Sequence, residues 1–264
     1  MKLKNIVKME SLFIKSFHLA KSNPNKTGLM ILFDVLFLVS VLGLYNLFNY
    51  FAQSLALPTT LISAFVFIGF SLIYYLIILF AYSFFKYIIL DYIKSLFEQT
   101  EFSFKRLAQF YSLNIIIAGT FFAILILANF LLAIIKAQYR PFVFIFLAIP
   151  YFLFLYVIIN TSHSLFYEGN SIKDSIKKSF RITFTKMKVY RETILIMILF
   201  ALLLWLLFLG SGYLIRILAS KNYNLYLTTY SYFRQVSIII FDLVFYLIIL
   251  INRISFYDIV RESK

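Results

Sequence analysis

Residues 35–85 decide the fold, because they form an uncharged run of 51 residues, VLFLVSVLGLYNLFNYFAQSLALPTTLISAFVFIGFSLIYYLIILFAYSFF. A helix that crosses the hydrocarbon core of a bilayer, roughly 30 Å thick, needs about 20 apolar residues, so this run is too long for one span. Pro58 interrupts it, and proline is favoured at the start of a helix, where its missing N–H is not needed. We therefore expect two spans here, at about 28–50 and 58–86.

The rest of the chain contains further uncharged runs of helix length. They predict four more spans, at about 107–135, 141–167, 193–215 and 235–252. Strands of a membrane barrel are segments of about ten residues with alternating hydrophobicity, which these continuous apolar runs do not match. We expect an all-α fold: a polytopic bundle of six transmembrane helices forming a single membrane domain over residues 1–264.

The composition excludes most soluble classes of protein. Hydrophobic residues make up 62% of the chain and charged residues 14%, whereas soluble domains carry about 45–50% and about 25%. The chain has no cysteine and two histidines, which excludes thiolate catalysis, iron–sulfur clusters and a histidine-rich metal site. It also lacks a metalloprotease motif, a glycine-rich phosphate loop and a nucleophile elbow. We therefore expect no metal, no cofactor and no catalytic residue.

The distribution of lysine and arginine predicts the orientation. Of the 25 basic residues, 20 lie in the two terminal segments and the loops after the second and fourth spans, and five lie in the other loops. Basic residues accumulate on the cytoplasmic side of membrane proteins. This distribution predicts that both termini lie in the cytoplasm. Topology thus accounts for the net charge of +14, and we expect no nucleic-acid partner.

Residues 171–191 have the pattern of an amphipathic helix at the membrane interface, beginning with the capping-box sequence Ser171-Ile-Lys-Asp174. Apolar residues lie on one arc of the predicted helix: Ile172, Ile176, Phe180, Thr183, Phe184 and Met187. The basic residues occupy the adjoining arc, and we expect these to bind lipid headgroups: Lys173, Lys177, Lys178, Arg181 and Lys188. The cytoplasmic N-terminus, residues 1–27, repeats the pattern before Asn23-Pro24 breaks the helix.

Two stretches resemble a known group of proteins. SFHLAKSNPNK (16–26) precedes the first span, and SIKDSIKKSFRITFTK (171–186) precedes the fifth. Both resemble the recurring elbows of a loose group of prokaryotic six-span proteins, mostly uncharacterised, that includes the membrane domain associated with glycerophosphoryl diester phosphodiesterases. The resemblance implies an integral membrane module without established chemistry, and it transfers no functional residue.

Ionisable residues at membrane depth are costly and are therefore functional candidates. Asp242 lies about midway between Arg234 and Arg253, so near the centre of the bilayer. It either fixes helix packing through donors such as Tyr246, or Asn129 and Ser211 of other spans, or serves as a proton or cation site.

Two further intramembrane candidates are Asp34, within reach of Lys26, and His163, in the polar run Asn160–Ser164. His163 either lines a vestibule or belongs to a helix end that satisfies its own carbonyls. Asp91 and Asp258 fall at the ends of even-numbered spans, beside Lys94 and Arg261, and we expect ion pairs there.

Three residues predict local irregularities within spans. Pro150 should kink the fourth span, because proline removes a backbone hydrogen bond. Gly210 and Gly212, in a Gly-Ser-Gly sequence, allow close helix approach or a local break of the fifth span.

Three functions remain open on this basis. The first is a multi-pass membrane protein without catalysis, with a structural or lipid-interacting role and with anionic lipids, a second copy or another membrane protein as partners. The second is a small transporter or channel that uses Asp242. The third is a membrane-embedded enzyme acting on lipids, for which the sequence offers only Asp242 with Asp34, or His163 with Asp91, as acid pairs.

Overall fold

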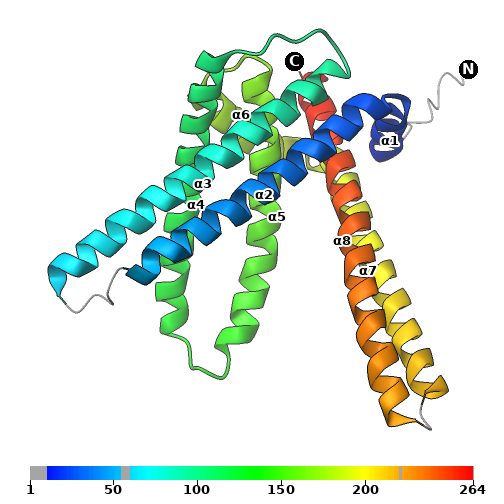
Figure 1. The fold of residues 1–264 in the computed structure, drawn as a ribbon. Coiled ribbons are helices and arrows are strands. Elements are labelled where there is room, and N and C mark those ends of the chain that lie inside the picture. The colour runs from blue at the N-terminus through cyan, green and yellow to red at the C-terminus, as the bar shows by residue number, and fades with distance from the viewer. Residues whose placement is uncertain (1–10, 55–59, 220–221, 264) are drawn as a thin grey trace, which may run out of the picture. The chain divides into compact units, whose positions relative to one another are not determined.

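The computed structural model describes residues 11–54, 60–219 and 222–263, which form eight helices and no strand. Six of these helices are long and apolar enough to cross a membrane. They are α2 (Pro24–Ser54), α3 (Leu61–Ser95), α4 (Phe104–Ala133), α5 (Arg140–Tyr167), α7 (Met187–Leu218) and α8 (Tyr223–Arg261) (Figure 1). Each corresponds to one predicted span, so the all-α fold with six apolar helices is confirmed.

Most of the observed helices extend beyond the uncharged runs that predicted them, although α4 ends at Ala133, before the predicted end at residue 135. The largest difference is α8, which has 39 residues where residues 235–252 were predicted. Arg234 and Arg253 bound the uncharged run, but arginine is a good helix former and does not end a helix. The runs therefore mark the apolar stretch rather than the helix ends. The predicted start of the second span, Pro58, lies outside the described residues, and α3 begins after Thr60, which caps it.

Two shorter helices, α1 (Leu12–Ser22) and α6 (Ile172–Thr185), precede long ones. The break predicted at Asn23-Pro24 is confirmed, because α1 ends at Ser22 and α2 begins at Pro24. The predicted helix 171–191 is too long, since Lys186 leaves the helical conformation (φ −104°, ψ 19°) and α7 begins at Met187. Lys188 therefore lies in the first turn of α7 and not on α6.

The turn between α5 and α6 depends on Gly169. This glycine has φ 102°, a left-handed conformation that other residues rarely adopt. Its N–H donates to the carbonyl of Phe166 and that of Asn170 to Leu165, which together form a Schellman motif. At the other side of the turn, the backbone N–H of Asp174 donates to the Ser171 hydroxyl at 3.1 Å, so the predicted cap is present.

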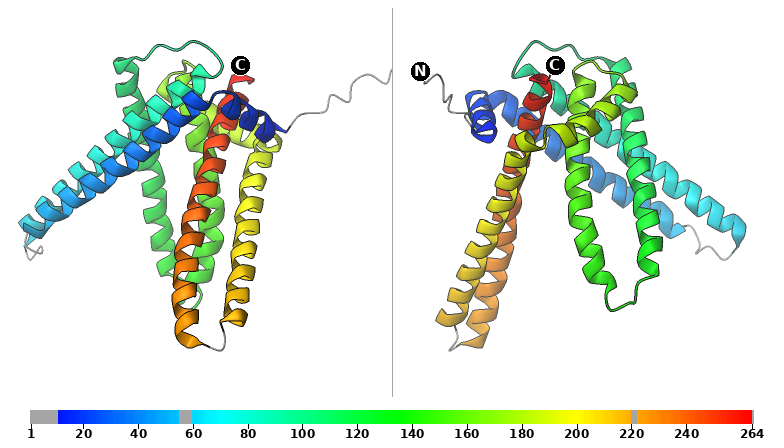
Figure 2. Two further views of the ribbon diagram at one scale, coloured as in Figure 1. Left: turned by 45° about the vertical axis from the view of Figure 1, so that its right-hand side comes forward. Right: turned by 180° about the vertical axis from the view of Figure 1, so that it is seen from behind.

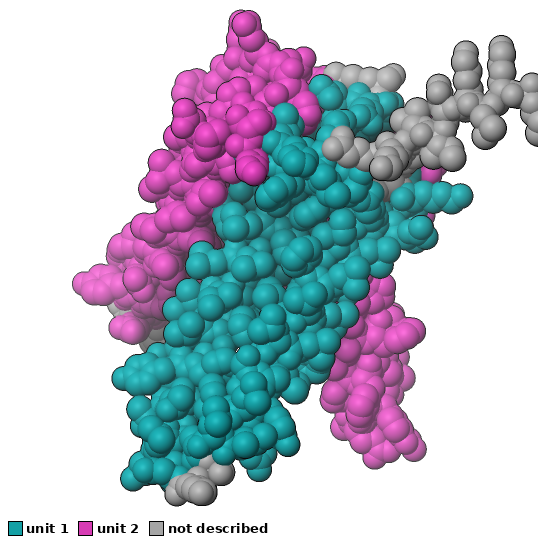
Figure 3. Space-filling model, turned by 90° about the vertical axis from the view of Figure 1, so that its right-hand side faces the viewer, with its two compact units in different colours: residues 1–20, 186–264 teal, residues 21–185 magenta. Residues whose placement is uncertain are grey.

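The chain divides into two compact units, which Figure 3 shows in different colours. One comprises residues 1–20 and 186–264, and the other comprises residues 21–185. In the second unit, α2 and α3 form a hairpin, α3 packs on α4, and α4 and α5 form another hairpin (Figure 1). Helix α6 lies across α5 and α4 near the end of α5 (Figure 2).

The first unit consists of the α7–α8 hairpin and residues 12–20 of α1. Its buried residues concentrate in the last third of α8, between Ile248 and Val260. Helix α7 runs unbroken through the Gly-Ser-Gly sequence. A side chain at Gly212 would come within 3.4 Å of the Phe233 ring of α8, whereas Gly210 faces open space. A contact of 3.4 Å is an ordinary van der Waals distance, so the role expected for these glycines in close helix approach stays a prediction. Helix α5 of the other unit likewise continues through Pro150.

Candidate functional site: a buried polar cluster and a basic helix

A chain of hydrogen bonds between buried side chains connects three helices of the 21–185 unit. His163 of α5 is 1% exposed, and its Nε2 lies 2.7 Å from Oδ1 of Asn114 in α4. The Nδ2 of Asn114 donates to Oγ of Ser83 in α3 at 3.0 Å. Ser83 in turn donates to the carbonyl of Leu79, 2.7 Å away in its own helix. We call His163, Asn114 and Ser83 the polar cluster.

The direction of these bonds determines the tautomer of His163. Asn114 uses its amide nitrogen to donate to Ser83, so the oxygen that faces His163 accepts. The Nε2 of His163 therefore carries the proton. Two aromatic rings flank the imidazole, those of Phe110 at 4.7 Å and Tyr82 at 6.2 Å between centroids. This arrangement holds the imidazole in place.

The neighbours of His163 behave as the helix-end alternative predicts. Asn160, Thr161, Ser162 and Ser164 all donate to backbone carbonyls of α5 itself. All four are buried. His163 is the exception in this run, because it reaches another helix. The run thus joins α5 to the bundle through one residue and satisfies its remaining side chains locally.

A second polar contact lies in the same unit, at Asp91 of α3. The Tyr167 hydroxyl of α5 donates to its carboxylate. The expected ion pair of Asp91 with Lys94 is wrong, because Lys94 instead lies 3.0 Å from Glu98, one turn further along α3. Arg106 of α4 donates to the Phe166 carbonyl at 2.8 Å, so α4 and α5 are also tied together here.

Helix α6 contacts the bundle through small residues. Ser175 and Ser179 are fully buried and Ile182 and Thr183 nearly so, whereas Phe184 is 70% exposed. The predicted apolar arc is therefore only partly the buried side. Serine has little hydrophobicity, but its size allows two helices to approach closely. Phe180 and Phe184 both contact the ring of Phe154 in α5, with centroids 5.8 and 5.9 Å apart.

The basic residues of α6 point away from the bundle. Lys173, Lys177 and Arg181 are exposed, and none of their side chains makes a hydrogen bond or ion pair with another residue in the described part of the chain. Lys178 is exposed too and donates to the Asn170 side chain at 2.6 Å. The helix thus presents three free cations beside two exposed aromatic rings.

The two intramembrane aspartates occupy different environments. Asp34 is half-buried in α2, and Lys26 donates to the Ser95 carbonyl rather than to Asp34. Asp242 is exposed on the α7–α8 hairpin, and within the described ranges it makes no hydrogen bond or ion pair. Asn129, one of its expected partners, donates instead to the Leu125 carbonyl of its own helix.

In the other unit, a charged cluster joins α1 to the end of α8. The Asp258 carboxylate, 2% exposed, lies 2.6 Å from Lys15 and 2.9 Å from Arg261. The pairing with Arg261 was expected, but Lys15 is 243 residues away and was not. Hydrogen bonds to Asp258 and Glu262 raise the pKa of Lys15 above its ordinary value.

No group of three histidine or acidic side chains able to hold a metal ion occurs among the residues that the structure describes. No protein-family model, curated protein or solved structure matches the chain. The resemblance to the six-span group therefore stays a prediction. The six apolar helices by themselves indicate a multi-pass membrane protein.

Proposed function

We propose that this chain is a multi-pass protein of a prokaryotic cell membrane with a non-catalytic, structural or lipid-interacting role, and that α6 binds anionic lipid headgroups. Both termini lie in the cytoplasm on this proposal. Its support is the bias of 20 basic residues against five across the predicted loops and ends.

One observation carries the headgroup assignment. The serine side of α6 is buried against the bundle, which leaves Lys173, Lys177 and Arg181 exposed without protein partners. Phe184 lies exposed beside them. A helix with basic and aromatic side chains turned outward matches the interface of a bilayer, where each basic residue near anionic lipid contributes about 1 kcal/mol.

Lipid titration of the purified protein tests this assignment. Phosphatidylglycerol and phosphatidylcholine are added separately in mild detergent, and bound lipids are counted by native mass spectrometry. The variant K173Q/K177Q/R181Q should lower the preference for phosphatidylglycerol at least about tenfold, because three contributions of about 1 kcal/mol are lost.

The control is K136Q/R216Q/R234Q, which removes three exposed cations from the segments predicted to lie outside the cell. It should leave the preference unchanged. Equal preference in all three proteins would exclude α6 as the headgroup site.

The absence of cysteine makes the orientation directly testable. Single substitutions Lys177→Cys and Lys136→Cys introduce a unique thiol at exposed positions on opposite predicted sides. In intact cells, a membrane-impermeant maleimide should label Lys136→Cys alone, and Lys177→Cys should react only after the cells are opened. The reverse pattern would invert the topology.

A transporter or channel that uses Asp242 is the second candidate function. It is favoured by the position of this carboxylate, which is exposed in the middle of α8 without a bond to another described residue. In reconstituted vesicles, Asp242→Asn should abolish proton- or cation-dependent flux, and Glu101→Gln, at an exposed loop position, should not. Flux that survives Asp242→Asn would reject this candidate.

A further inference from the structure

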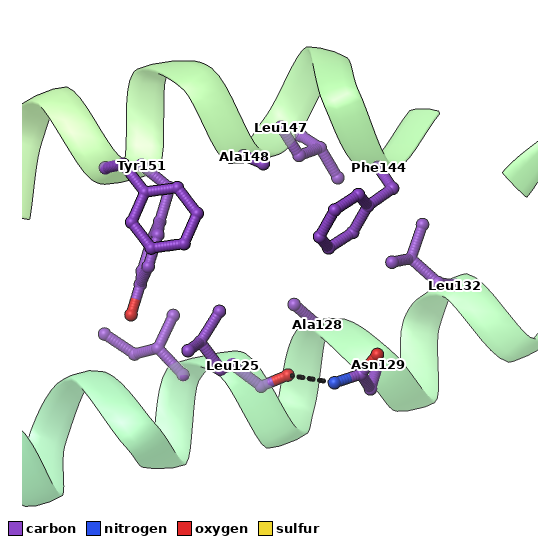
Figure 4. Close-up of a pocket in the computed structure, with 10 residues that line it drawn as sticks. Leu125, Ala128, Asn129, Leu132, Phe144, Leu147, Ala148 and Tyr151 are labelled. Carbon is purple, nitrogen blue, oxygen red and sulfur yellow. Dashed lines mark hydrogen bonds between the residues drawn. The ribbon is translucent and has the colours of Figure 1, made fainter. Parts of the chain in front are cut away.

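The helices of the 21–185 unit line two neighbouring cavities, both of them open on one side. The first, about 290 Å³, lies between α4 and α5. Figure 4 shows Phe144 and Tyr151 of α5 and Ala128 of α4 around it. The second, about 250 Å³, is lined by α3, α4 and α5. Leu125 and Tyr151 line both, so the cavities are adjacent chambers separated by these two side chains.

The walls of both chambers offer little to water. Most lining residues are aliphatic or aromatic. Two of the polar groups already have partners in the protein: the Tyr151 hydroxyl donates to the Phe121 carbonyl at 2.8 Å, and the Asn129 amide donates to Leu125 at 3.2 Å. Pockets lined in this way favour apolar ligands over water. The chambers therefore suit hydrocarbon.

Asn114 supplies one polar group at the far wall of the second chamber. It lines the cavity and is 3% exposed. A side-chain amide has two N–H donors, and Asn114 uses one of them, toward Ser83. Within the described residues the second donor has no acceptor, so a ligand oxygen can take that place. Sites with apolar walls and a few placed polar groups are typical of small-molecule pockets.

The chambers follow α4 from Asn114 to Leu132. At 1.5 Å per residue this is a path of about 27 Å, comparable to the hydrocarbon thickness of about 30 Å. A path this long and narrow fits an extended chain rather than a compact ring system.

We propose that the two chambers bind one long unbranched hydrocarbon chain with an oxygen at its end, and that this oxygen accepts a hydrogen bond from Nδ2 of Asn114. A fatty acid or the acyl tail of a bilayer lipid has this chemistry. The site is distinct from α6 and does not depend on headgroup binding there.

Photolabelling with two probes tests the site and identifies the source of the chain. One probe is palmitic acid with a diazirine at its methyl end, and the other is a phosphatidylcholine carrying the same acyl group. The protein is reconstituted with each probe, irradiated and digested, and the labelled residues are located by mass spectrometry. Label is expected on α4 and α5 around the first chamber. Label from the phospholipid alone identifies a bilayer tail, and label from both identifies a free chain as well.

Matched alanine substitutions on one helix make the test specific. Ala118 lines the second chamber and Ala128 the first, whereas Ala123 lies on the exposed side of α4. A118F and A128F fill the chambers and should lower labelling at least fivefold. A123F adds the same ring outside and should leave it unchanged. Equal labelling of the three variants would overturn the proposal.

The polar end is tested separately with Asn114→Leu. It removes the donor but also the acceptor of His163, so it is compared with His163→Leu, which breaks the same buried bond and keeps the Asn114 donor. The concentration of unlabelled palmitic acid that displaces the probe should rise at least fivefold more in Asn114→Leu than in His163→Leu. Equal displacement concentrations in the two variants would overturn the role of Asn114. The variant K173Q/K177Q/R181Q should label like the wild type, so failure of the headgroup proposal and failure of this one give different results.

Discussion

The two ends of the α3–α4–α5 bundle in the 21–185 unit are built differently. At one end, where α3 and α5 finish and α4 begins, aromatic and polar side chains such as Tyr87, Phe110 and His163 are fully or almost fully buried. At the other end, α4 and α5 line the first chamber, which is open on one side, and Phe130 and Phe144 are exposed. The first end is closed and polar, and the second is open and apolar.

This difference has a physical reason in a membrane setting. Lipid tails are as apolar as leucine, so apolar side chains gain little by leaving lipid for another helix. Buried hydrogen bonds and small residues hold helices together instead. The closed end has both, in the polar cluster and in the serines of α6. The open end has mainly apolar side chains, and its helices leave room between them.

Among the variants that test this comparison, His163→Leu is expected to lose the most stability. It leaves the Asn114 oxygen buried without its donor, which costs up to about 3 kcal/mol of unfolding free energy. Phe144→Leu at the open end should cost no more than about 0.5 kcal/mol, because the side chain is exposed. Unfolding in mixed micelles with increasing dodecyl sulfate measures both. Equal losses would show that the closed end owes nothing to the polar cluster.

A double substitution sharpens the same prediction. In Asn114→Leu/His163→Leu both members of the buried hydrogen bond become apolar. Ser83 loses the bond from Asn114, but its hydroxyl still donates to the Leu79 carbonyl. Replacing both members of a buried bond is much less costly than replacing one. The double variant should therefore be more stable than the sum of the single losses predicts. Additive losses would mean that the two residues act independently.

The next largest losses of stability are expected from removing two tyrosine hydroxyls, one at the closed end and one between the chambers. Tyr167→Phe removes the donor to Asp91 at the closed end and should cost about 2 kcal/mol, since bonds to carboxylates are stronger than neutral ones. Tyr151→Phe removes a bond to the Phe121 carbonyl beside the chambers and should cost about 1 kcal/mol. Both are read from the same unfolding experiment. A larger loss for Tyr151→Phe would reverse the assignment of the closed end.

The six spans could be predicted from the sequence because charge is excluded from the hydrocarbon core, which leaves long uncharged runs. Helix ends were less predictable, since residues such as Arg253 continue a helix beyond the apolar stretch. His163 was identified by its rarity at membrane depth. Asn114 and Ser83 were missed, because a single neutral polar residue in an apolar span indicates no partner. Their bonds join residues 49 and 31 positions apart, which only the packing of helices reveals.

The prediction of helix α6 from the sequence was limited in the same way. Periodicity predicted a helix with a basic side, and α6 has one. Its apolar side was predicted to enter the membrane interface, and no contact with other helices was predicted. The structure buries Ser175 and Ser179 in such a contact, because small side chains permit close approach.

A smaller loss of stability is therefore expected from Ser179→Leu. The larger side chain overfills the contact between α6 and α5 and should cost about 1 kcal/mol. Hydrogen exchange should show faster exchange of α6 amides, with the rest of the closed end unchanged. Thr185→Leu, at the exposed last residue of α6, is the control and should have no effect. Slow exchange in Ser179→Leu would show that α6 does not depend on this contact.

The smallest loss of stability is expected from Lys15, in the charged cluster of the other unit. The pKa of Lys15 is raised by Asp258 and Glu262, so its stabilisation is fully present below its ordinary value of 10.5 and is lost as pH rises through the higher folded value. Lys15 is half-exposed, and solvent screening limits the contribution to less than about 1 kcal/mol. Between pH 9 and pH 12, the wild type should lose more stability than Lys15→Met, by this amount. A pH-independent difference between wild type and Lys15→Met would show that Lys15 contributes through packing of its alkyl chain and not through its charge.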